Sequence, residues 1–94
     1  MYLDDYVIRS TDDIPWDQLP DYVNWWVAEP WGGSWGWQEE PQLIELVEGF
    51  GPQWVAESGY TPVFAGWVQG TDWMSSKRKR PENNVMLGDP PGVA

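Results

Sequence analysis

Residues 22–39 read YVNWWVAEPWGGSWGWQE, and this stretch decides the fold expected of the chain. Two runs rich in aromatic and β-branched residues flank a segment that contains a pair of glycines. Such an arrangement is a β-hairpin signal, because glycine adopts the positive φ angles that tight turns need. The sequence therefore predicts a hairpin over 22–39 with its turn inside Pro30–Ser34.

The side chains of this hairpin alternate between its two faces. With period two, Val23, Trp25 and Val27 fall on one face, whereas Trp26 and Ala28 fall on the other. Both faces carry an indole, so we expect both to be covered at least in part.

Three further segments favour strands, namely 2–9, 54–56 and 62–68. Together with the hairpin they predict a β-rich α+β fold: a small twisted antiparallel sheet of about four or five strands with at most one or two short helices. We expect a single domain over 1–82. Residues 83–94 are rich in proline and glycine and are expected to form an extended or docked tail.

Other segments predict turns or stay ambiguous. The proline-rich stretch 14–20 favours a tight turn or a single 3₁₀ turn. Residues 42–50 are ambiguous. Their apolar residues fit one face of a two-turn helix, and a strand fits them almost equally well. Residues 72–76 favour a short helix with Thr71 or Asp72 as its cap.

Nine tryptophans among 94 residues are more than so small a core can hide. Each indole also carries one N–H donor that needs a partner when it is buried. We therefore expect some indoles to line a binding surface and the chain to self-associate, with a dimer as the default assembly.

The residues that usually carry catalysis are missing. The chain has no histidine and no cysteine, and the adjacent carboxylates of Asp4-Asp5, Asp12-Asp13 and Glu39-Glu40 diverge on a strand. No phosphate-binding glycine loop or metal-ligand spacing is present. We expect neither enzymatic activity, nor a cofactor, nor a metal. Without a leader pattern or a long apolar run, the protein is expected to be cytoplasmic and not to bind a membrane.

Acidic and basic residues are distributed unevenly along the chain. Residues 1–76 hold thirteen acids and one base, Arg9, which sum to −12, whereas residues 77–80 are all basic. The acidic body disfavours direct contact with nucleic acid. The basic run is either a solvated segment that also neutralises nearby acids, or a phosphate-binding segment.

Tryptophan beside arginine indicates a ligand site. Aromatic rings can stack on a planar base while a guanidinium holds a phosphate. The indoles near the glycine turn and the late basic run supply both groups. The candidate ligand-binding residues are Trp31, Trp35, Trp37, Trp73, Arg78 and Arg80.

The order of these features resembles a group of small tryptophan-rich accessory proteins of tailed bacteriophages and prophages. The resemblance covers most of 14–41 and 66–82, and the chain departs from the pattern over 2–9 and 42–62. It implies a phage origin and an accessory role, and it carries no activity or site residue. The motifs that support it are Trp16-Asp17-Gln18-Leu19-Pro20, Val23-Asn24-Trp25-Trp26-Val27-Ala28, Gly33-Ser34-Trp35-Gly36-Trp37-Gln38-Glu39-Glu40-Pro41 and Asp72-Trp73-Met74-Ser75-Ser76-Lys77-Arg78-Lys79-Arg80-Pro81.

Two functions fit these observations. The first is a non-enzymatic counter-defence protein that sequesters a nucleotide-derived host immune signal by tryptophan stacking and arginine–phosphate contacts. The second is an acidic inhibitor of a host defence protein, of the anti-CRISPR or DNA-mimic kind. A minor virion or regulatory component is a third possibility.

Overall fold

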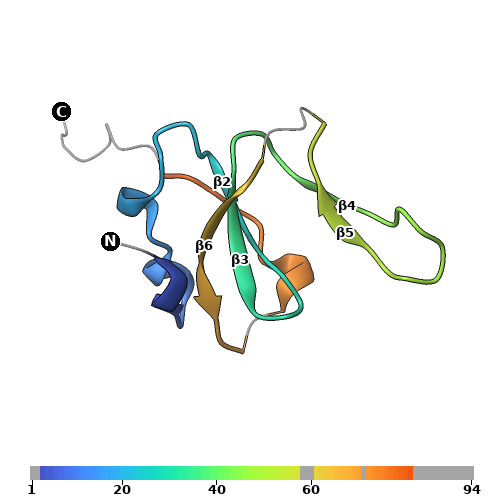
Figure 1. The fold of residues 1–94 in the computed structure, drawn as a ribbon, viewed down its shortest axis with the longest axis horizontal. Coiled ribbons are helices and arrows are strands. Elements are labelled where there is room, and N and C mark those ends of the chain that lie inside the picture. The colour runs from blue at the N-terminus through green and yellow to red at the C-terminus, as the bar shows by residue number, and fades with distance from the viewer. Residues whose placement is uncertain (1–2, 58–60, 71, 82–94) are drawn as a thin grey trace.

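The computed structural model describes residues 3–57, 61–70 and 72–81. A five-stranded sheet has the strand order β1-β6-β3-β2-β7, and β4 and β5 form a separate two-stranded sheet (Figure 1). The described residues also hold four three-residue 3₁₀ turns in place of one or two short helices. The elements are η1 (Leu3–Asp5), β1 (Val7–Ile8), η2 (Thr11–Asp13), η3 (Trp16–Gln18), β2 (Trp25–Ala28), β3 (Gly33–Trp37), β4 (Gln42–Ile44), β5 (Gln53–Val55), β6 (Val63–Val68), η4 (Trp73–Ser75) and β7 (Arg78–Lys79).

The hairpin predicted over 22–39 is confirmed. Strands β2 and β3 pair antiparallel, with Trp25 opposite Trp37 and Ala28 opposite Ser34. The amide of Glu29 donates to the carbonyl of Gly33 at 2.9 Å and closes the turn. Gly32 has a φ of 102° in this turn, a conformation that side chains other than glycine rarely adopt.

The prediction of one purely antiparallel sheet is wrong. Strand β1 pairs parallel to β6, with Val7 opposite Trp67, so the five-stranded sheet is mixed. A period-two pattern identifies a strand but not its neighbour or its direction, and β1 lies far from β6 along the chain. Strands β4 and β5 pair only with each other, and their hairpin extends away from the main sheet (Figure 1).

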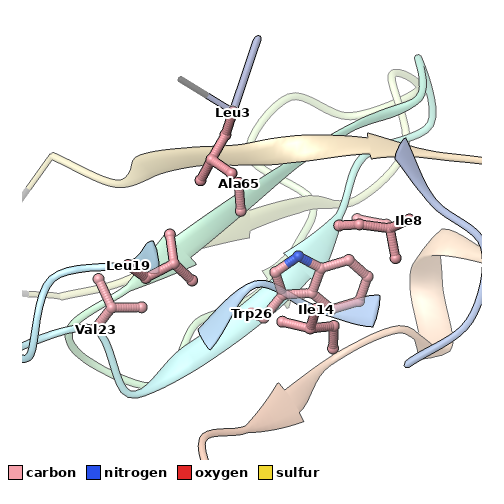
Figure 2. Close-up of a cluster of buried hydrophobic side chains, with 8 residues drawn as sticks. Leu3, Ile8, Ile14, Leu19, Val23, Trp26 and Ala65 are labelled. Carbon is pink, nitrogen blue, oxygen red and sulfur yellow. The ribbon is translucent and has the colours of Figure 1, made fainter. Parts of the chain in front are cut away.

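The face of the main sheet that carries Trp26 and Ala28, here called the inner face, holds the larger core. Trp26 is buried beside Ile8 and Ile14, which come from the N-terminal segment (Figure 2). The rest of this core consists of Leu3, Leu19, Val23, Ala28 and Ala65. The 3₁₀ turns η1, η2 and η3 therefore cover the inner face, and the single 3₁₀ turn predicted within 14–20 is confirmed as η3.

The opposite face, here called the outer face, holds a smaller core beneath β4 and β5. Trp54 of β5 is buried against Val27 and Trp37, with Trp25 and Trp35 packed around them. Its indole Nε1 donates to the carbonyl of Ala28 at 2.9 Å. Leu43 of β4 packs against the same cluster, so the two-stranded sheet is attached to the main sheet through Trp54 and Leu43. The expectation that both faces are covered in part is confirmed.

Residues 42–50 form a strand only over β4, after which the chain makes an exposed loop. The apolar side chains of Leu46, Val47 and Phe50 lie in this loop, and Phe50 is 79% exposed. Gly49 and Gly51 have positive φ angles, which end any helical stripe after too few residues. The helical alternative is therefore wrong for this segment.

The C-terminal part of the described chain contains the short helix predicted over 72–76, in the form of a 3₁₀ turn. This turn is η4, and Asp72 occupies its cap position without a side-chain cap hydrogen bond. The tail predicted at 83–94 lies outside the described residues. Within the described part of the chain, every helix is too short to cross a membrane.

Candidate binding surface

Four aromatic side chains on the outer face form a closed ring of edge-to-face contacts, here called the aromatic tetrad. The ring centroid of Trp31 lies 6.3 Å from that of Trp35 and 5.9 Å from that of Trp67. Phe64 closes the ring, at 5.6 Å from Trp35 and 5.4 Å from Trp67. Edge-to-face pairs at these separations are favourable, because the positive edge of one ring meets the negative face of the next.

A β-bulge places the tetrad on a single face. Strand β6 pairs with β3 so that Ser34 lies opposite Gly66 and Trp35 lies opposite Phe64, which leaves Ala65 as an extra residue. This extra residue reverses the alternation, so Phe64 and Trp67 share the outer face although they are three positions apart. Ala65 remains in the inner core.

Much of the tetrad is open to solvent. Trp31 is 55% exposed and Trp67 is 40% exposed, and the exposed side chain of Val7 lies next to Trp67 through the β1–β6 pairing. The indole Nε1 of Trp67 donates to the backbone carbonyl of Asp4. The tetrad and Val7 therefore form one continuous apolar surface at the end of the sheet where the hairpin turn lies.

Acidic residues occur near this surface. Asp4 and Asp5 belong to η1 and are exposed, and the backbone carbonyl of Asp4 accepts the hydrogen bond from Trp67. Glu29 stands at the hairpin turn, two residues before Trp31, and burial raises the pKa of its carboxyl above the ordinary value of 4.5. An apolar surface with an acidic rim favours a partner that combines apolar groups with positive charge.

Several tryptophans serve the cores instead. Trp37, one of the predicted site residues, is buried in the outer core, and Trp73 packs edge-to-face on Trp54 with a centroid distance of 6.5 Å. Among the described residues, the indole N–H groups of Trp26 and Trp37 have no hydrogen-bond partner. Each buried donor without a partner lowers the free energy of unfolding by roughly 1–3 kcal/mol. Packing of the indole rings therefore outweighs this loss at these positions.

The basic run alternates across the sheet. In the β2–β7 pairing Arg78 lies opposite Trp26 and Lys79 opposite Trp25, so Arg78 belongs to the inner face and Lys79 to the outer face. The tetrad residues Trp31 and Trp35 lie on the outer face, across the sheet from Arg78. One chain therefore does not bring the predicted phosphate-binding arginine to the exposed indoles.

The two ends of the basic run have structural partners. Lys77 Nζ lies 2.7 Å from a Glu40 carboxylate oxygen and stands over the ring of Trp25. Arg80 donates from Nη1 to the carbonyls of Pro20 and Val23, both at 2.8 Å. Its Nη2 donates to the carbonyl of Trp16 at 2.6 Å, and its guanidinium lies over that indole. Arg80 thus joins β7 to the segment before β2.

Sequence reasoning missed Phe64 and Trp67 as surface residues. Both lie in the predicted strand 62–68, but regular alternation puts positions 64 and 67 on opposite faces. Gly66, which follows Ala65, could have indicated the bulge, because an isolated glycine within a strand often marks one.

The described residues contain no cluster of three or more acidic side chains that could hold a metal ion. Comparison of the chain with protein-family models, with curated proteins and with solved structures found no match.

Proposed function

We propose that this chain is a non-enzymatic binding protein that acts on another protein and presents the aromatic tetrad to a basic surface of that target. The observation that carries the proposal is the partly exposed ring of Trp31, Trp35, Phe64 and Trp67. It corresponds to the second of the two functions expected from the sequence.

The tetrad has the properties of an interface centre. Tryptophan is enriched among the few residues that supply most binding energy in protein interfaces. The mutual contacts of the four rings hold Trp31 and Trp67 in place before a partner arrives, which lowers the entropy lost on binding. An arginine of the target placed over an exposed indole would add a cation–π contact of roughly 0.5–2 kcal/mol.

Charge supports a basic target. The chain has a net charge of −10. The acidic turn η1 contacts Trp67 through the Asp4 backbone carbonyl, and Glu29 lies in the hairpin turn two residues before Trp31. Such a field accelerates encounter with a positively charged surface and disfavours acidic partners. The resemblance to phage accessory proteins suggests that the target is a host protein of nucleic-acid-based defence, because such proteins carry basic grooves.

Capture of a target from bacterial lysate, followed by titration of the purified target, tests the proposal. Trp31→Ala should weaken binding by about 10- to 100-fold, since an interface tryptophan commonly contributes on the order of 1.4–3 kcal/mol. Tyr22→Ala is the matched control, because Tyr22 is 50% exposed and lies outside the tetrad. Its affinity should stay within about twofold of the parent.

The salt dependence distinguishes a specific basic target from general adhesion. Parent binding should weaken as ionic strength rises, because screening removes the contribution of the acidic rim. A target that binds the Trp31→Ala variant as tightly as the parent would contradict the proposal.

A further inference from the structure

A pocket of about 250 Å³ opens on the inner side of the sheet, away from the tetrad. Its apolar wall includes Ile8 and Val68, which lie opposite each other in the β1–β6 pairing. Its polar wall includes Arg78, Asp72 and Thr11. A positive charge, a negative charge and a hydroxyl therefore face a common space beside an apolar surface.

Backbone carbonyls hold the guanidinium of Arg78 at this pocket. Its Nη1 donates to the carbonyls of Ser75 at 3.2 Å and Lys77 at 2.9 Å. Among the residues that the structure describes, the only ion pair is that between Lys77 and Glu40, and no described carboxylate pairs with Arg78. The remaining guanidinium donors have no protein acceptor among the described residues and are available to an anion.

Asp72 supplies acceptors in the same pocket. It stands at the cap position of η4, but its carboxylate makes no cap hydrogen bond there, and its backbone carbonyl accepts from Ser75. The carboxylate is also not paired with Arg78 in the described structure. Two opposite charges that share a pocket without pairing suit a ligand that carries both an anion and hydroxyl donors.

We propose that this pocket binds the sugar–phosphate part of a nucleotide. Arg78 would hold the phosphate, with the hydroxyls of Ser10 and Thr11 as additional donors. Asp72 would accept hydrogen bonds from the ribose hydroxyls, as acidic residues do in other nucleotide sites. Val68 would contact the carbon face of the sugar. We expect the sugar and the phosphate to occupy the pocket and the base to extend towards solvent.

The proposal keeps Arg78 as the phosphate ligand expected from the sequence but not the stacking tryptophans. Trp31 and Trp35 lie across the sheet from Arg78, Trp37 is buried in the outer core, and Trp73 packs on Trp54. It is independent of the proposed protein-binding function, because the tetrad and the pocket share no residue. Loss of one site leaves the other measurable in the same protein.

Calorimetric titration with AMP, ribose 5-phosphate, adenosine and inorganic phosphate tests the assignment. AMP and ribose 5-phosphate should bind with similar affinity, and each should bind at least 10-fold more tightly than adenosine or inorganic phosphate. Arg78→Gln should weaken AMP binding about 10- to 100-fold, the loss expected for one or more charge-assisted hydrogen bonds. Arg78→Lys should give an intermediate loss, because lysine keeps the charge but not the planar fork.

Lys79→Gln is the matched control, because Lys79 is the neighbouring cation on the opposite face of β7. It should bind AMP within about twofold of the parent. Asp72→Asn should weaken binding of AMP and ribose 5-phosphate but leave inorganic phosphate unchanged. Absence of AMP binding, an equal loss in the Lys79→Gln and Arg78→Gln variants, or inorganic phosphate binding as tight as that of AMP would overturn the proposal.

Discussion

The indole of Trp31 occupies the space that a side chain at Gly33 would fill. An ideal Cβ on Gly33 would lie 2.2 Å from both Cη2 and Cζ3 of Trp31, far inside van der Waals contact. The absence of a side chain at Gly33 therefore lets the Trp31 ring pack against the backbone of β3 and contact Trp35 and Trp67. One glycine thus determines whether the aromatic tetrad can close.

Gly33→Ala should open the tetrad without unfolding the chain. Trp31 is 55% exposed, so its ring can move into solvent, losing its edge-to-face contacts with Trp35 and Trp67 but leaving the buried cores intact. We expect the near-ultraviolet circular dichroism of the coupled indoles to fall to the level of the Trp31→Ala variant, with the free energy of unfolding lowered by less than about 1 kcal/mol. An unchanged spectrum would show that Trp31 does not pack on Gly33.

Gly36→Ala, three residues along the same strand, is the contrasting control. A Cβ on Gly36 would lie 2.7 Å from Cγ1 of Val23, which is fully buried in the inner core and cannot move aside. This substitution should lower the free energy of unfolding by about 1–3 kcal/mol, the range seen for overpacked cores. Equal stabilities of the two variants in urea unfolding would contradict this account of the two faces.

Arg80→Lys should destabilise the fold although it keeps the charge. The guanidinium of Arg80 donates to three backbone carbonyls, those of Trp16, Pro20 and Val23, and an ammonium group cannot reproduce this geometry. We expect a loss of about 2 kcal/mol in the free energy of unfolding, measured by urea titration. Arg78→Lys is the control and should change it by less than about 0.5 kcal/mol, because Arg78 is exposed. Equal effects of the two substitutions would rule out the structural role of Arg80.

Glu29 should make the protein less stable as the pH rises through the range just above 4.5. Burial raises the pKa of Glu29 in the folded chain, so at these pH values the native state binds more protons than the unfolded state. The free energy of unfolding therefore decreases until Glu29 is ionised in both states. Glu29→Gln should remove this decrease and raise the melting temperature slightly at pH 7.

The measurement is a series of melting temperatures across the acidic pH range. Glu48→Gln, a change at an exposed loop glutamate, should keep the pH profile of the parent. A Glu29→Gln variant with the parent's pH profile would exclude an effect of burial on the carboxyl.

The sequence predicts self-association, and we expect the exposed loop after β4, rather than the indoles, to mediate it. Leu46 and Phe50 are 58% and 79% exposed, and apolar side chains gathered at a loop tip favour an interface. We expect sedimentation at micromolar concentration to show a dimer, and the Leu46→Ser/Phe50→Ser variant to sediment as a 10.8 kDa monomer. Trp31→Ala should remain dimeric. A parent protein that sediments only as a monomer would contradict the prediction.

The central hairpin could be predicted from the sequence because its determinants are local. The period-two pattern around Trp25 and Trp26 assigns their faces, and Gly32 supplies the positive φ that the turn needs. The 3₁₀ turn at Trp16 follows from neighbouring prolines in the same way. In each case the residues that determine the conformation lie within a few positions of one another.

The candidate sites depended on contacts between distant segments. Ala65 forms a bulge only because β6 pairs with β3, and that pairing brings Phe64 and Trp67 onto the face of Trp31. Likewise, β7 pairs with β2, so Arg78 turns towards the pocket while Lys79 lies on the other face. The sequence by itself determined the central hairpin and the 3₁₀ turn at Trp16, because local sterics and side-chain periodicity act along the chain. The tertiary structure alone decided which strands are neighbours and which side chains meet, because that choice depends on packing between segments far apart in sequence.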